Sequence, residues 1–214
     1  MSTTRNPKFQ AVIFDMDGVL TDSEPYYHEA INAVLAKHKL FLTEKENEAI
    51  LGFGVKETWV WLIAHFKLSD KLEQWLAAYD VEVLRILKAK VTPASGLSAL
   101  IAGFQKRNFR FGLASSSQRN WIDAVLTKLR LTKTFEVIVS GGEVKKGKPN
   151  PEIYLKAAEH LGVAPARCLV IEDSPTGIKA GKAAGMTVVA VRTEYTKGLD
   201  ISKADVVIDS LDKF

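Results

Sequence analysis

Six short apolar runs alternate with helical patterns, and this alternation constrains the fold more than any other feature of the chain. The runs are rich in Val, Ile and Phe, as buried strands are, and cover residues 9–16, 109–115, 135–141, 167–173, 187–192 and 204–210. The helical patterns between the later runs cover residues 95–108, 118–131, 151–162 and 176–185. Asn150–Pro151 is typical of a helix start, with Asn150 as the N-cap. Strands and helices in alternation predict an α/β fold with a doubly wound parallel sheet.

The segment from residue 24 to residue 91 breaks this alternation. It contains no convincing strand and instead carries apolar residues at helical spacing, including three of the four tryptophans. Such a pattern is typical of helices that pack on one another. We therefore predict an all-helical domain at residues 24–91, inserted into a sheet domain formed by residues 1–23 and 92–214.

The composition argues against membrane and nucleic-acid partners. No run approaches the roughly 20 apolar residues of a membrane span, and residues 1–10 lack the apolar stretch of a secretory signal. The net charge is +4, but Lys and Arg are scattered rather than clustered as a nucleic-acid surface requires. The single cysteine, Cys168, excludes a disulfide framework and fits a reducing compartment. We therefore expect a cytoplasmic protein that binds neither membrane nor nucleic acid.

Two carboxylates, Asp15 and Asp17, stand at the end of the first apolar run with only Met16 between them. Burial opposes charge, and two neighbouring like charges raise each other's cost. A bound cation or a reacting phosphate would compensate for this cost. In open parallel sheets, ligands bind beyond the carboxyl ends of the strands, which is where both carboxylates are expected.

Polar residues follow the later runs as well. They are Ser115–Ser117, Lys148 in the loop after the third run, and Glu172–Asp173. Carboxylate oxygens suit Mg²⁺, a carboxylate can attack phosphorus to form an aspartyl phosphate, and lysine and hydroxyl groups neutralise phosphoryl oxygens. These residue types together predict phosphoryl transfer in which Asp15 attacks and Asp17 handles the proton.

Four motifs in this order resemble those of the haloacid dehalogenase superfamily over essentially the whole chain. They are D-x-D-G-V-L-T-D at 15–22, Ser115 after an apolar run, K-P at 148–149 and E-D-S at 172–174. D-S-E-P at 22–25 and G-K-P-x-P at 147–151 are similar to the branch of β-phosphoglucomutase-like phosphatases. The helical insertion resembles the first-type cap of that superfamily, and a monomer is compatible with this architecture.

The resemblance implies catalytic and metal-binding roles for the carboxylates. Asp15 matches the nucleophile and a Mg²⁺ ligand. Asp17 matches the general acid/base, and its backbone carbonyl matches a further ligand. Asp173 matches a Mg²⁺ carboxylate, and Glu172 matches a second acidic position that ligates directly or through water.

The resemblance also implies a phosphate site. Ser115 matches the phosphate-binding hydroxyl, and we place Ser116 beside it. Lys148 matches the lysine that bridges the nucleophile and the phosphate. Gly18 permits a tight turn in which backbone amides approach the phosphate.

A cap of this kind would close over the strand ends, exclude water and reopen. Its loop at residues 52–54 would act as a flexible lip, and Gly54 and Lys56 are the candidate substrate contacts. We expect these residues to influence which phosphate ester is chosen.

Three functions fit the motifs. We favour a Mg²⁺-dependent phosphatase of small phosphorylated metabolites, with sugar phosphates as the expected class. A β-phosphoglucomutase is the alternative, but Tyr27 stands where such mutases carry a histidine, and only Lys56 could replace their cap arginine. A phosphate-binding or regulatory protein without turnover is the third, and phosphate release from an ester distinguishes it. Asp17 argues against a dehalogenase, which protonates no leaving alkoxide.

Overall fold

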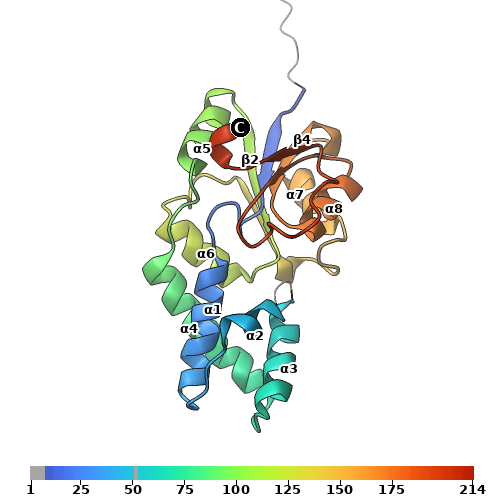
Figure 1. Ribbon diagram of the computed structural model, residues 1–214. Coiled ribbons are helices and arrows are strands. Elements are labelled where there is room, and N and C mark those ends of the chain that lie inside the picture. The colour runs from blue at the N-terminus through green and yellow to red at the C-terminus, as the bar shows by residue number, and fades with distance from the viewer. Residues whose placement is uncertain (1–7, 51–52) are drawn as a thin grey trace, which may run out of the picture. The chain divides into compact units, whose positions relative to one another are not determined.

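The computed structural model describes residues 8–50 and 53–214, and the chain divides into two compact units. The first consists of Met1–Ser23 with Thr92–Phe214, and the second of Glu24–Val91. Figure 1 follows both units along the chain, with the second in blue to green.

The first unit is built on a six-stranded sheet in which every neighbouring pair is parallel. Its strands are β1 (Ala11–Phe14), β2 (Arg110–Ser115), β3 (Val137–Ser140), β4 (Cys168–Glu172), β5 (Thr187–Val191) and β6 (Val206–Ile208), in the order β3-β2-β1-β4-β5-β6. The winding therefore reverses at β1, which lies between β2 and β4. The predicted α/β fold with a doubly wound parallel sheet is confirmed.

Helices cover both faces of this sheet (Figure 1). They are α5 (Leu97–Lys106), α6 (Arg119–Lys128), α7 (Glu152–His160) and α8 (Pro175–Ala183), with short 3-10 turns η1 (Gly141–Glu143), η2 (Pro165–Arg167) and η3 (Leu211–Lys213). Helices α7 and α8 share one core with Ile13 and Val170 of the sheet. On the opposite face, the ring of Phe14 stacks on Phe111 at 6.1 Å and meets Phe104 of α5 edge-on at 6.3 Å. Burial on both faces explains why the strands read as unbroken apolar runs.

In the second unit, the regular elements within residues 24–50 and 53–91 are all helices. They are α1 (Glu24–Ala36), α2 (Glu44–Glu48), α3 (Val55–Phe66) and α4 (Leu72–Lys90). Helix α1 packs against α4, and Trp59 of α3 stacks on Trp75 of α4 with ring centroids 5.5 Å apart. Apolar faces at helical spacing are thus buried within this unit, as the sequence pattern indicates.

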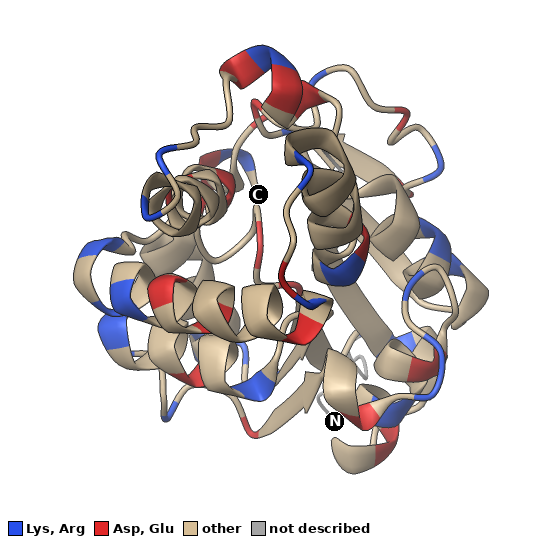
Figure 2. Cartoon of the chain, turned by 90° about the horizontal axis from the view of Figure 1, so that it is seen from below, with Lys and Arg blue, Asp and Glu red and all other residues tan. Residues whose placement is uncertain are grey.

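Charge is mixed rather than segregated. Figure 2 shows Lys and Arg interspersed with Asp and Glu along the helices. Within residues 8–50 and 53–214, the structure has no helix with the length and apolarity required to span a bilayer.

Candidate active site

The carboxyl ends of β1, β2 and β4 bring together residues from distant parts of the sequence. Asp15 follows β1 directly, Ser115 ends β2 and Glu172 ends β4. Lys148, from the loop between β3 and α7, reaches this edge of the sheet and contacts both Asp15 and Glu172. These residues therefore lie at the point where the winding reverses, which is where doubly wound sheets bind their ligands.

The ammonium group of Lys148 is fully engaged. Its Nζ lies 2.5 Å from Asp15 Oδ1, 2.8 Å from Glu172 Oε1 and 3.1 Å from the carbonyl oxygen of Ala114. Burial lowers the pKa of Lys148, but the Asp15 and Glu172 carboxylates outweigh burial and raise it well above its usual value. Lys148 is therefore a charged group with one acceptor for each of its three hydrogens.

Glu172 is held by donors on both of its oxygens. Oε1 accepts from Lys148 and from the Tyr154 hydroxyl at 3.0 Å. Oε2 accepts the backbone N–H groups of Asp173 and Ser174, both at 2.8 Å, and the Ser174 hydroxyl at 3.0 Å. Burial raises the pKa of Glu172, but Lys148 and these hydrogen bonds produce a net lowering. Glu172 is thus an ionised carboxylate whose orientation is fixed.

Asp17 is oriented by two serine hydroxyls. The Ser23 Oγ donates to Asp17 Oδ1 at 2.5 Å, and the Ser117 Oγ donates to Asp17 Oδ2 at 2.9 Å. Sequence reasoning did not include Ser23 in the site, and it placed Ser117 in the serine cluster at the strand ends without giving it a role. The available signals were the serine in D-S-E-P and the third member of the serine run at 115–117.

The loop after β2 places the serines at different depths. Ser115 is fully buried, and its Oγ accepts the N–H of Ser117 at 3.0 Å, so its own hydrogen is available for an anionic ligand. Ser116 is exposed. A Cβ on Gly141, at the end of β3, would collide with the Ser116 backbone carbonyl, so these two loops pack closely.

Gly18 allows the turn after β1 to lie against Asp173. Its φ is +75°, a left-handed conformation that favours glycine, and its N–H donates to the carbonyl of Thr21 at 2.8 Å. A Cβ at this position would collide with the Asp173 carboxylate. Gly18 therefore makes room for an acidic side chain at the strand ends.

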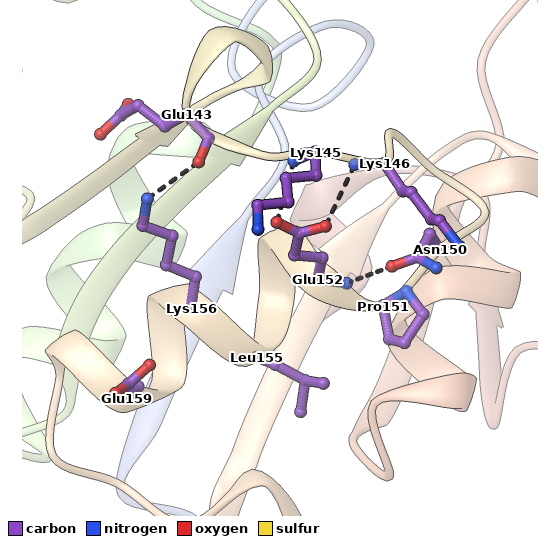
Figure 3. A pocket seen from close by; sticks show the side chains of 9 residues that line it. All are labelled: Glu143, Lys145, Lys146, Asn150, Pro151, Glu152, Leu155, Lys156 and Glu159. Atoms are coloured by element: carbon purple, nitrogen blue, oxygen red, sulfur yellow. Dashed lines mark hydrogen bonds between the residues drawn. The ribbon is translucent and has the colours of Figure 1, made fainter.

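Hydrogen bonds join the loop that carries Lys148 to the first turn of α7 (Figure 3). The Glu152 carboxylate accepts the N–H groups of Lys145 at 2.9 Å and Lys146 at 3.0 Å. Asn150 Oδ1 accepts the N–H of Glu152 at 3.1 Å. The helix begins at Glu152, one residue later than a first helical residue at Pro151 would give. Asn150 still accepts the N–H two residues on, which is the bond expected of the predicted N-cap.

A pocket of about 570 Å³ lies beside this loop (Figure 3). Its lining consists of Glu143, Lys145, Lys146, Asn150, Pro151, Glu152, Leu155, Lys156 and Glu159. Three lysines and three glutamates balance its charge, and none of the predicted site residues lines it.

The carboxyl groups at the strand ends raise one another's pKa. Burial, reinforced by neighbouring carboxylates, raises the pKa of Asp15 to about 8 even though Lys148 acts in the opposite direction. Burial and the Glu172, Asp15 and Asp17 charges likewise raise the pKa of Asp173 well above its usual value. Lys148 contacts two of these carboxyl groups, Asp15 and Glu172. The oxygen donors fit a hard divalent cation such as Mg²⁺, whose charge would favour the ionised form of each carboxyl group.

The candidate metal-binding side chains do not form a preformed site in the part of the chain that the structure describes. Across the described parts of the chain, no three His, Cys, Asp or Glu side chains form a ready metal cluster. Both oxygens of Glu172 are occupied by protein donors. Asp15, Asp173 and the Asp17 carbonyl are therefore the better candidates for direct contact with a metal.

The predicted substrate contacts of the cap belong to the second unit. Gly54 precedes α3 and donates its N–H to Glu57 Oε2 at 3.0 Å, and Lys56 is exposed. Gly52, the other glycine of the predicted lip, lies outside the described residues.

Comparison with known proteins establishes the family. The model of the haloacid dehalogenase-like hydrolases matches residues 9–185. The chain belongs to this family. The hydrolase is therefore an enzyme with the fold and motif set that its sequence resembles.

The relatives include phosphatases and a mutase. "Phosphorylated carbohydrates phosphatase" of Thermotoga maritima is 36% identical and aligns over 83% of this chain and 82% of its own length. The β-phosphoglucomutase of Bacillus subtilis is 33% identical and aligns over 93% of this chain and 88% of its own length. The crystal structure of CbbY from Rhodobacter sphaeroides in complex with phosphate superposes with a TM-score of 0.84 at 26% identity, covering 96% of each chain.

Proposed function

We propose that the hydrolase is a Mg²⁺-dependent phosphatase of small phosphate esters, with sugar phosphates as its substrate class, and that it acts through an aspartyl phosphate on Asp15. The observation that carries this proposal is the buried contact of Lys148 with both Asp15 and Glu172 beside the serine-oriented Asp17. The named activity of the Thermotoga maritima relative supports the substrate class.

Each residue then has a step that its geometry suits. The Asp15 carboxylate attacks phosphorus and the bond to the ester oxygen breaks, while Asp17 protonates that leaving oxygen. Asp17 then accepts a proton from the water that attacks the aspartyl phosphate, which releases phosphate and restores Asp15. Lys148 and the Ser115 hydroxyl stabilise the charge on the phosphoryl oxygens. The two serines keep Asp17 directed for both proton transfers.

Mg²⁺, held by Asp15, Asp173 and the Asp17 carbonyl, would neutralise the phosphate and the carboxylates and so allow two anions to approach. Glu172 would act mainly by holding Lys148, with any metal contact made through water. Lys56 and Gly54 remain the proposed substrate contacts of the helical unit, and no partner other than a small ester is proposed.

A mutase is the second candidate because a β-phosphoglucomutase is 33% identical to this chain. A mutase must hold the aspartyl phosphate until a second sugar hydroxyl attacks it. Tyr27 stands at the position of the mutase histidine, and Lys56 is the only available counterpart of the cap arginine. Both differences favour water as the acceptor.

Phosphate release from a panel of esters tests the proposal. The panel contains hexose 6-phosphates, β-glucose 1-phosphate, phosphoglycolate and a nucleotide, each assayed with Mg²⁺ and with a chelator. We expect Mg²⁺-dependent release that is fastest on the sugar phosphates. Conversion of β-glucose 1-phosphate to the 6-phosphate with a bisphosphate primer, in place of release, would identify a mutase. Phosphate binding without turnover of any ester would identify a binding protein.

Gly18→Ala tests the placement of Asp173. The new Cβ must displace the Asp173 carboxylate, so we expect hydrolysis to fall about 100-fold, the usual effect of a displacement near 1 Å in an active site. Gly103→Ala is the control, because Gly103 lies in α5 with open space around it. That variant should keep full activity and gain up to about 1 kcal/mol of stability. Equal activity of the two variants would refute the placement.

A further inference from the structure

Tyr154 is a buried residue that sequence reasoning did not include in the site. It is fully buried in the first turn of α7. Its hydroxyl donates to Glu172 Oε1 at 3.0 Å, the same oxygen that accepts from Lys148 at 2.8 Å. The Lys148 ammonium also lies 4.8 Å from the centroid of the Tyr154 ring. One side chain therefore contacts both halves of the Lys148–Glu172 pair.

We propose that Tyr154 is a positioning residue that holds Lys148 against Asp15 by sharing Glu172. The proposal rests on the proposed function, since it concerns the placement of the lysine that faces the phosphoryl group. Tyr154 contacts Glu172 and Lys148, so it would act on the reaction through these two neighbours.

Lys148 has three hydrogen-bond acceptors around its ammonium group. Its ammonium is shared among Asp15, Glu172 and the carbonyl of Ala114. Its position therefore depends on how strongly each acceptor attracts it. A carboxylate oxygen that already accepts a second hydrogen bond attracts a cation less than one that is otherwise bare, because part of its charge is compensated.

The Tyr154 hydroxyl supplies that second hydrogen bond to Glu172 Oε1. Without it, Lys148 would be the sole donor to Oε1 among the described contacts. The ammonium would then move toward Glu172 and away from Asp15, where the phosphoryl group is transferred. The aromatic ring of Tyr154 also attracts the Lys148 ammonium, because a cation close to an aromatic ring is stabilised by it.

Tyr154→Phe removes only the hydroxyl and retains the buried ring. We expect kcat to fall about tenfold with KM changed by less than about twofold, because the ground-state contacts of the ester are kept while the hydrogen bond that orients Lys148 is lost. Tyr79→Phe is the matched control, since Tyr79 is a buried tyrosine of α4 outside the site. Its kinetic constants should equal those of the wild type.

A double-mutant cycle separates positioning from general loss of structure. If Tyr154 acts through Glu172, the same substitution in a Glu172→Gln background should lower kcat by less than about twofold. An undiminished tenfold effect in that background would show that Tyr154 acts by another route and would overturn the proposal.

Crystal structures of the wild type and Tyr154→Phe provide a readout that does not depend on activity. We expect the distance from Lys148 Nζ to Asp15 Oδ1 to lengthen in the variant while the distance to Glu172 Oε1 does not. Inactivity of the wild type on every ester would refute the proposed function, and these distances would still decide the role of Tyr154. An active wild type with an equally active Tyr154→Phe, or an unchanged lysine position, would overturn the inference alone.

Discussion

Asp15→Asn should abolish phosphate ester hydrolysis, with a loss of about 10⁴-fold or more, as for removal of other catalytic nucleophiles. The amide has nearly the same shape as the carboxylate, so it preserves packing at this buried position. It cannot, however, attack phosphorus as an anion. Phosphate release per mole of folded enzyme, measured on the best ester of the panel, gives the loss directly.

Asp123→Asn is the control for that experiment. Asp123 forms an exposed ion pair with Arg119 within α6, at 3.0 Å, and has no place in the proposed mechanism. Its activity should stay within about twofold of the wild type, since exposed helix pairs contribute little. If Asp15→Asn retained as much activity as Asp123→Asn, the nucleophile would have to be sought elsewhere.

Lys148→Met should cause the largest loss of stability. Its side chain is 5% exposed, and those of its partners Asp15 and Glu172 are 10% and 1% exposed. Removing the cation leaves two buried carboxylates without their charge partner, which typically costs about 3–5 kcal/mol. Urea unfolding followed by circular dichroism measures the change, and phosphate release should be lost as well.

The stability deficit of Lys148→Met should depend on pH. A buried carboxyl group without a cation has a raised pKa, so the folded variant binds more protons than its unfolded chain. Its stability therefore falls as pH rises above the unfolded-state value near 4. The deficit relative to the wild type should be larger at neutral pH than in mild acid, and a deficit independent of pH would contradict this explanation.

Lys182→Met provides a comparison at equal distance but different burial. Lys182 Nζ lies 2.5 Å from Asp205 Oδ1, with side chains 39% and 36% exposed. Exposed pairs are worth up to about 1 kcal/mol, so this variant should be only slightly destabilised. A similar loss in both lysine variants would mean that burial does not control the energy of the Lys148 contacts.

The sheet could be predicted because its central strands are buried on both faces. Runs such as residues 168–172 are apolar throughout, and the segments between them have helical spacing, so both element type and winding follow from the pattern. The ends of elements were less predictable. Helix α7 begins at Glu152, one residue later than expected, although Asn150 accepts the N–H of Glu152 as the predicted N-cap should.

The gathering of carboxylates, a serine and a lysine at one edge of the sheet was also predictable, since the carboxyl ends of parallel strands lie together. Contacts that depend on the direction of a side chain could not be predicted from the sequence. The sequence does not show that Glu172 Oε1 faces Lys148 and Tyr154. It places Ser23 and Ser117 near the strand ends, but it does not show that their hydroxyls bond Asp17. Tyr154 has the helical spacing of an ordinary core residue, and only the structure reveals the acceptor of its hydroxyl.

Chemical trapping of the intermediate tests the central claim most directly. The wild-type enzyme would be mixed with its best ester and Mg²⁺, quenched in acid during turnover, and reduced with borohydride, which converts an aspartyl phosphate to homoserine. Mass spectrometry of the peptides then locates the modified residue. We predict homoserine at position 15, and none when the ester is omitted. Turnover that leaves Asp15 unmodified, or that modifies a different carboxylate, would contradict the account.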